Sequence, residues 1–102
     1  MEIVTVHSDI ADTIKSFDAI TQAKIARLVK LLEMKEYYLG MPYSKKIAPN
    51  LYELRIKSIQ NVRIFYMFHN EQIVLLHVIT KKTQKLSKKD IEKAVTRAKS
   101  VV

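Results

Sequence analysis

Hydrophobic positions in the first part of the chain recur mostly every three or four residues, the spacing of amphipathic helices. Before them, the β-prone residues 3–6 predict a short strand. Ser8 is the expected N-cap of a short helix whose apolar face carries Ile10, Ile14 and Phe17. The chain is therefore expected to begin with a strand and a helix.

A second, longer helix is expected to begin after Asp18, another residue type that caps helices, and to run to Leu39. Its expected apolar stripe consists of Ile20, Ala23, Leu28, Leu31 and Leu32. Gly40, the only glycine in the chain, lies where a helix C-cap needs a left-handed residue. Pro42 cannot continue the helix, so residues 40–50 are expected to form a loop.

The second half changes to the alternating pattern of strands. Within residues 51–57, one face carries Tyr52, Leu54 and Ile56, and the other carries Glu53, Arg55 and Lys57. Residues 62–68 and 73–80 predict two further strands. The last strand is apolar on both faces except at His77, so it is expected to be central. Asn61 and Asn70 are expected to take positive-φ positions in the turns.

A final helix is expected after Ser87, with Asp90 three residues on as a weak capping box. Its apolar stripe consists of Ile91, Ala94, Val95, Ala98 and Val102. The expected order is β-α-α-β-β-β-α, an α+β fold with a small, mainly antiparallel sheet, two N-terminal helices and a C-terminal helix. A length of 102 residues fits one domain over 1–102.

Composition excludes several classes of protein. Hydrophobic residues make up 48% of the chain, with one Gly and two Pro, so a disordered chain is not expected. Cysteine is absent, which excludes disulfides and thiolate sites. No apolar run approaches the ~20 residues of a membrane span, and the first residues lack the pattern of a signal peptide. A cytoplasmic location is therefore expected, without membrane association.

The net charge of +8 is concentrated in the second half. Residues 1–50 contain seven basic and six acidic residues, and residues 51–102 contain eleven and four, so the balances are +1 and +7. Such an excess predicts a polyanionic partner, nucleic acid or the ribosome, although a solvated surface is the simpler alternative. The residues expected to contact RNA are Lys81, Lys82, Lys85, Lys88 and Lys89.

A candidate cationic pocket lies on the strands. Arg55 and Lys57 share one strand face, and Arg63 joins this face if the intervening loop has three or five residues, because side chains alternate. Lys81 or Lys82 is expected nearby. The set predicts an exposed face that holds a phosphate and stabilises a pentavalent transition state. A merely solvated sheet face is the alternative.

Other titratable residues are weaker candidates. His77 is expected to be a hydrogen-bonded core residue, and Tyr66 is expected to point into the core with Phe68. The three histidines lack the spacing of metal ligands, and no Gly-rich phosphate loop is present. No metal or other cofactor is therefore predicted.

Four stretches together resemble the RelE/HigB toxins of bacterial type II toxin–antitoxin systems, and most closely the HigB-like, phage-associated branch. They are LYELRIK at 51–57, VRIFY at 62–66, LLHVITKKTQK at 75–85 and DIEKA at 90–94. The resemblance covers nearly the whole chain. It implies a RelE-like fold and a ribosome-dependent endoribonuclease, or mRNA interferase, that inhibits translation. It also implies a cognate antitoxin, expected to be a HigA-like helix-turn-helix protein.

Such a toxin uses the RNA 2′-hydroxyl to attack the adjacent phosphorus, which requires no metal. The expected catalytic residues are Arg55, Lys57, Arg63 and Lys82. The arginines suit bidentate phosphate binding, and Lys57 or Lys82 suits the general base, since neighbouring cations lower the pKa of a lysine. A ParE-type inhibitor of DNA gyrase on the same fold and a non-catalytic nucleic-acid-binding domain are the alternatives. The antitoxin is expected either to cover the basic residues or to wrap the two N-terminal helices.

Overall fold

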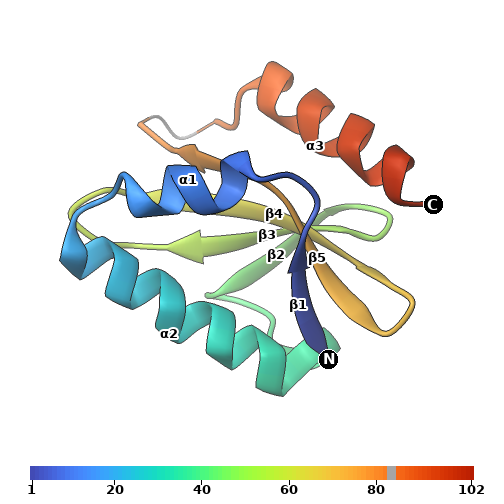
Figure 1. Ribbon diagram of the computed structural model, residues 1–102, viewed down its shortest axis with the longest axis horizontal. Coiled ribbons are helices and arrows are strands. Elements are labelled where there is room, and N and C mark those ends of the chain that lie inside the picture. Colours follow the sequence, from blue (N-terminus) through green and yellow to red (C-terminus); the bar gives the residue numbers. More distant parts are fainter. Residues whose placement is uncertain (83–84) are drawn as a thin grey trace.

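The computed structural model describes residues 1–82 and 85–102. Its elements are β1 (Glu2–Thr5), α1 (Asp9–Lys15), α2 (Ala19–Lys35), a 3₁₀ helix η1 (Glu36–Tyr38), β2 (Ser44–Ala48), β3 (Leu51–Ile56), β4 (Val62–His69), β5 (Gln72–Thr80) and α3 (Lys88–Val101) (Figure 1). The α+β class is confirmed, with one strand more than the sequence predicted.

The strands form one sheet in the order β1-β5-β4-β3-β2. β1 runs parallel to β5, and the other neighbours are antiparallel. The helices α1 and α2 lie on one side of the sheet and α3 on the other (Figure 1). β5 lies between β1 and β4, so the prediction of a central strand covered on both sides is confirmed.

The two faces of β3 and β4 build two cores. Leu54, Ile56, Ile64 and Tyr66 join residues of α1 and α2 in one core, as the alternating pattern predicted. Phe65 joins the second core, which α3 completes through Ala94. Complete burial of such large apolar side chains contributes about 1.5–3 kcal/mol each to the free energy of unfolding.

The first turn of α2 is held by a capping interaction that the sequence predicted. The Asp18 carboxylate accepts a hydrogen bond from the Thr21 backbone N–H at 2.9 Å. Thr21 is fully buried, and its hydroxyl also contacts Asp18 and Ser58. Ser8 and Ser87 occupy cap positions, but within the described part of the chain their side chains make no capping hydrogen bond.

The prediction of a loop over residues 40–50 was wrong, because residues 44–48 form the edge strand β2. This strand pairs with β3 and carries a bulge between Lys46 and Ala48. It is short and its lysines are exposed, which is typical of edge strands and leaves a weak sequence pattern. Gly40 has the expected positive φ of 57°, but the prediction that it caps the long helix was wrong, because α2 ends at Lys35 and its C-cap is Glu36 with a φ of 54°.

The predicted stripe of α2 was wrong in its first half, where Ile20 and Ala23 are exposed. Ile20 is 58% exposed, whereas Thr21, Ile25 and Leu32 are buried. The hydrogen bonds of Thr21 let a polar residue take a core position that hydrophobicity alone assigns to Ile20. Val102, expected in the stripe of α3, is exposed, and its neighbour Val101 packs in the second core instead.

The turn between β4 and β5 is a two-residue hairpin loop with positive φ values. Asn70 and Glu71 are the two loop residues, and both have positive φ values, 49° and 60°. Two-residue hairpin loops with this backbone match the twist of the flanking strands. The prediction for Asn70 is confirmed, whereas Asn61 lies in a longer loop and is not a positive-φ residue.

No helix within the described residues combines the length and the apolarity needed to cross a membrane.

Candidate active site

Arg55 and Arg63 are cross-strand partners on β3 and β4. Five residues, 57–61, separate the two strands, so the condition for a shared face is met. Glu53 lies two residues before Arg55 and shares this face, which is the α3 side of the sheet. Its Oε1 lies 3.6 Å from Arg55 Nε and 3.8 Å from Arg63 Nε.

This face is not exposed as expected, because Glu53 and Arg63 are 3% and 5% exposed. Arg63 lies on the interior strand β4, between Arg55 on β3 and Ile79 on β5. Neighbours on both sides therefore cover it. Arg55, one strand nearer the edge, keeps 22% of its side chain exposed.

Three charged atoms at the centre of this face lack hydrogen-bond partners within the described residues. They are Glu53 Oε2, Arg55 Nε and Arg63 Nε, all buried. Arg63 does donate through Nη1 to its neighbour, the Val62 carbonyl, at 3.1 Å. Burial lowers the pKa of Arg63, and Glu53 opposes this shift. An arginine nevertheless stays protonated, so the face retains a charged donor with unused capacity.

Lys81 completes the cationic set at the end of β5. Its backbone N–H donates to the Asn61 carbonyl at 2.7 Å, which holds the chain beside the β3–β4 hairpin. The pKa of Lys81 is lowered by burial and by Arg63, with smaller contributions from Arg55 and Lys45, while Glu53 opposes the shift. The lysine coupled to the arginine pair is therefore Lys81. We call Lys45, Glu53, Arg55, Arg63 and Lys81 the Glu53 cluster.

Sequence reasoning missed two members of this cluster. Glu53 carried a usable signal, since it alternates with Arg55 on one strand face. Lys45 carried none, because β2 was expected to be a loop, and only the register shows that Lys45 pairs with Glu53.

Comparison with known families identifies the chain. The family model described as Phage derived protein Gp49-like (DUF891) matches residues 12–99. The chain belongs to this family. The Gp49-like family is a RelE-related, toxin-like family, so the predicted resemblance is confirmed at this level, and the family implies an antitoxin partner. A search of curated proteins found no significant match.

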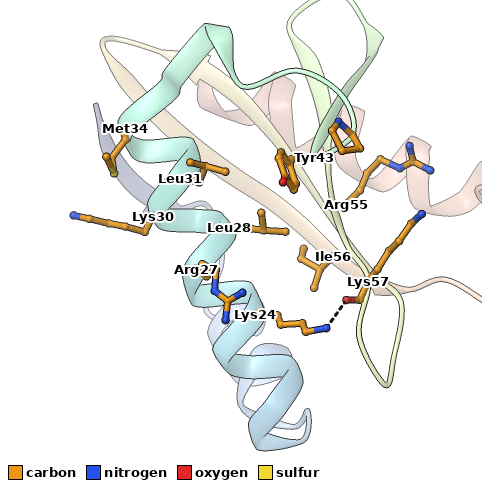
Figure 2. Close-up of a pocket in the computed structure, with 11 residues that line it drawn as sticks. Lys24, Arg27, Leu28, Lys30, Leu31, Met34, Tyr43, Arg55, Ile56 and Lys57 are labelled. Atoms are coloured by element: carbon orange, nitrogen blue, oxygen red, sulfur yellow. Dashed lines mark hydrogen bonds between the residues drawn. The ribbon is translucent and has the colours of Figure 1, made fainter.

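In this Gp49-like protein, Lys57 lies one residue beyond β3 and is exposed. Figure 2 shows its side chain leaving the chain on the same side as Arg55, away from α2. Both residues also line a groove between α2 and β3. Lys57 thus stands at the border between the Glu53 cluster and this groove.

The predicted RNA contacts of the Gp49-like protein lie mostly on its surface. Lys82, Lys85, Lys88 and Lys89 are exposed. Lys88 and Lys89 open α3, where Lys88 Nζ lies 4.0 Å from Glu92. Thr83 and Gln84, the middle of the KKTQK stretch, lie outside the described residues. The roles of these lysines stay predictions.

His77 is hydrogen-bonded and Tyr66 points into the core, as the sequence predicted. His77 Nε2 lies 2.9 Å from Asp90 Oδ1, and the His77 ring stacks on Phe65. Tyr66 is 1% exposed, its hydroxyl is hydrogen-bonded to Ser44, and burial raises its pKa. Within the described residues, no three His, Asp or Glu side chains are grouped in a way that could hold a metal ion.

Proposed function

We propose that this Gp49-like protein is the toxin of a type II toxin–antitoxin system and a ribosome-dependent mRNA endonuclease of the RelE/HigB kind. The carrying observation is the Arg55–Arg63 pair, whose Nε atoms are buried beside the Glu53 carboxylate and have no hydrogen-bond partner among the described residues. Burying charged groups without hydrogen bonds is costly. Such a concentration of buried charge calls for an explanation, and a phosphate that binds the exposed part of Arg55 and balances the positive charge supplies one.

The charge of the cluster suits a phosphate. Glu53 is ion-paired with Arg55 and Arg63, lies opposite Lys45 in the strand register and interacts electrostatically with Lys81, so four cations against one carboxylate leave an excess of three positive charges. Arg55 is the more accessible arginine, with 22% of its side chain exposed against 6% for Arg63. We therefore assign the phosphate contact to Arg55, with Arg63 and Glu53 as positioning residues behind it.

The proposed reaction is an in-line displacement at phosphorus. The RNA 2′-oxygen bonds to phosphorus while the bond from phosphorus to the 5′-oxygen breaks, which leaves a 2′,3′-cyclic phosphate and a 5′-hydroxyl. The 2′-hydroxyl loses its proton to a general base, and the departing 5′-oxygen gains one. Negative charge grows on the phosphoryl oxygens in the transition state, and Arg55 stabilises it.

Lys81 is the proposed general base, in place of Lys57 or Lys82. A lysine accepts a proton only in its neutral form, and burial with neighbouring arginines favours that form of Lys81. Lys57 and Lys82 are exposed and are assigned to contacts with the RNA backbone.

Translation of a defined mRNA in a purified system tests the proposal. Addition of the protein is expected to produce new mRNA ends, with cyclic phosphate termini, only when ribosomes are present. Supercoiling by DNA gyrase is measured in parallel. Blocked supercoiling without new mRNA ends would overturn the proposal in favour of a ParE-type gyrase inhibitor. The absence of both effects would favour a non-catalytic domain.

A further inference from the structure

A groove of about 630 Å³ lies between α2 and the end of β3. Figure 2 shows Leu28 and Leu31 of α2, Tyr43, and Ile56 of β3 directed into it. Its volume falls within the ~300–1,000 Å³ of ligand pockets. The side chains on its floor are apolar, and the groove is large enough to hold several side chains of a partner.

The groove exists because β2 leaves the edge of β3 early. The last strand pair is Ser44 with Leu54, and one further backbone bond joins Arg55 N–H to the Tyr43 carbonyl at 2.8 Å. Beyond that point α2 faces the edge of β3. Lys24 Nζ bridges the space to the Lys57 carbonyl at 3.2 Å, as Figure 2 shows.

Large apolar side chains stay accessible here. Tyr43 is 44% exposed and Met34, at the α2 side of the groove, is 68% exposed. An apolar surface rimmed by polar groups is typical of sites for protein partners. A single-stranded RNA would instead call for a series of aromatic platforms, one for each stacked base. The groove offers Tyr43 alone among its lining residues.

The rim of the groove is cationic. Its lining residues in the described chain include five basic side chains and no acidic one; the basic ones are Lys24, Arg27, Lys30, Arg55 and Lys57. Glu33, outside the lining, pairs with Lys30 at 3.0 Å, and Glu53 faces Arg55. The remaining rim keeps a positive excess, although residues 1–50 as a whole carry only +1.

We infer that this groove is the docking site of the antitoxin and that it takes an acidic segment whose apolar side chains fill the floor. The inference rests on the proposed toxin function, since that function needs a neutralising partner. Attraction between the basic rim and acidic side chains favours an acidic segment, and burial of its apolar side chains on the groove floor stabilises the complex. Arg55 belongs to both the groove rim and the Glu53 cluster. A docked carboxylate would therefore engage the arginine that binds the substrate phosphate, which couples docking to inhibition.

This placement also joins the two binding modes that the sequence left open. A segment in the groove lies along α2 and reaches Arg55 and Lys57 at the same time. Covering the basic residues and contacting an N-terminal helix then become one event.

A peptide probe tests the site directly. The probe has about 18 residues, long enough to form a helix, with Leu at three- and four-residue spacing and Glu at the other positions. Its affinity is measured by calorimetry on the folded protein, beside a peptide with Lys in place of Glu and a short oligouridylate. We expect saturable binding of the acidic peptide in the groove and no binding of the lysine peptide, and any binding of the oligouridylate is expected at the basic residues without use of the groove floor.

Two matched pairs of variants locate the binding. Arg27→Glu and Tyr43→Ser are each expected to lower the affinity for the acidic peptide at least about tenfold, a typical effect of removing an interface anchor. The controls Lys35→Glu on α2 and Tyr38→Ser, both exposed and outside the groove, are expected to change affinity less than about twofold. Unfolding curves of all four confirm that each variant is folded.

The outcomes separate the two proposals. No binding of the acidic peptide, equal losses in groove and control variants, or binding of the oligouridylate in its place would each overturn the docking site. Groove-specific binding by a protein that leaves mRNA intact would overturn the endonuclease proposal and retain the groove as a site for an acidic protein segment.

Discussion

Arg55 and Arg63 lie directly opposite each other on β3 and β4, with Glu53 Oε1 within 3.8 Å of both Nε atoms. Like charges in cross-strand positions destabilise a sheet. The buried carboxylate between them offsets part of this repulsion but does not hydrogen-bond either Nε atom. The arrangement therefore lowers the stability of the fold and concentrates positive charge at one place on the sheet.

Replacing Arg55 should mainly lower activity, whereas replacing Arg63 should mainly lower stability. Arg55→Ala is expected to lower mRNA cleavage by about two orders of magnitude, the effect of removing one transition-state donor, or ~3 kcal/mol. Lys46→Ala is the matched control, since Lys46 is exposed and pairs with Tyr52 on the opposite face. Mapped mRNA ends in the purified translation system give the rates. Cleavage by Arg55→Ala at the rate of the control would remove Arg55 from the site.

Arg63→Ala should destabilise the fold more than Arg55→Ala does. It strips a buried partner from Glu53, and breaking a buried ion pair costs about 3–5 kcal/mol. Adding Glu53→Gln to Arg63→Ala should recover part of this loss, because no buried carboxylate then remains. Urea unfolding measures the free energies. Equal stability of the two single variants would show that Arg63 is not held by Glu53.

The proposed base predicts a pH dependence of cleavage. Only neutral Lys81 accepts a proton, so the rate should rise as pH approaches the pKa of Lys81, which lies below the usual 10.5. Lys81→Arg keeps the charge but cannot deprotonate, so it should lower the rate and flatten this rise. Lys82→Arg is the control and should keep the wild-type profile. Rates between about pH 6 and pH 9 decide the point, and an unchanged profile in Lys81→Arg would contradict the assignment.

A second pH effect concerns stability and involves Asp9. Arg97 Nη1 donates to Asp9 Oδ1 at 3.0 Å, and chiefly this interaction lowers the pKa of Asp9 from 3.8 to about 2. Because the folded-state pKa is depressed, the stabilisation is present above 3.8 and is lost as pH falls through about 2. Asp9→Asn should therefore lower the melting temperature at neutral pH, and the difference from wild type should shrink near pH 2. Asp12→Asn, on the same helix and exposed, is the control.

Salt should weaken ribosome binding steeply. Each neutralised phosphate adds about 0.7–0.9 to the slope of log affinity against log salt. Replacing Lys88 and Lys89 together with Ala should therefore reduce that slope by about 1.5. The control replaces Lys15 and Lys35 with Ala. Both lie in residues 1–50, whose charge balance is only +1, so the slope should stay unchanged. A slope near zero for the wild-type protein would instead favour a target without nucleic acid.

The sequence by itself determined the features that depend on near neighbours in the chain. Alternation placed Leu54 and Ile56 on one face of β3, and the carboxylate of Asp18 capped α2, because both effects act within a few residues. The apolar character of residues 73–80 identified a central strand, since a strand with both faces apolar must be covered twice. The sequence left open whether Arg55 and Arg63 share a face, because that depended on the length of the loop between the strands, and only the register of β3 with β4 decided it.

Tertiary structure decided which of these side chains are accessible and which meet. The sequence predicted that Arg63 is exposed, but it is buried. Strands pair with both edges of β4, and α3 lies on the same side of the sheet as Arg63. Lys45 lies opposite Glu53 only because β2 pairs with β3, and the residues of β2 carry little strand signal. The groove beside Arg55 depends on where β2 begins, at Ser44, and on α2 facing the part of β3 that β2 leaves unpaired. These relationships join segments distant in sequence, and the packing of the whole chain determines them.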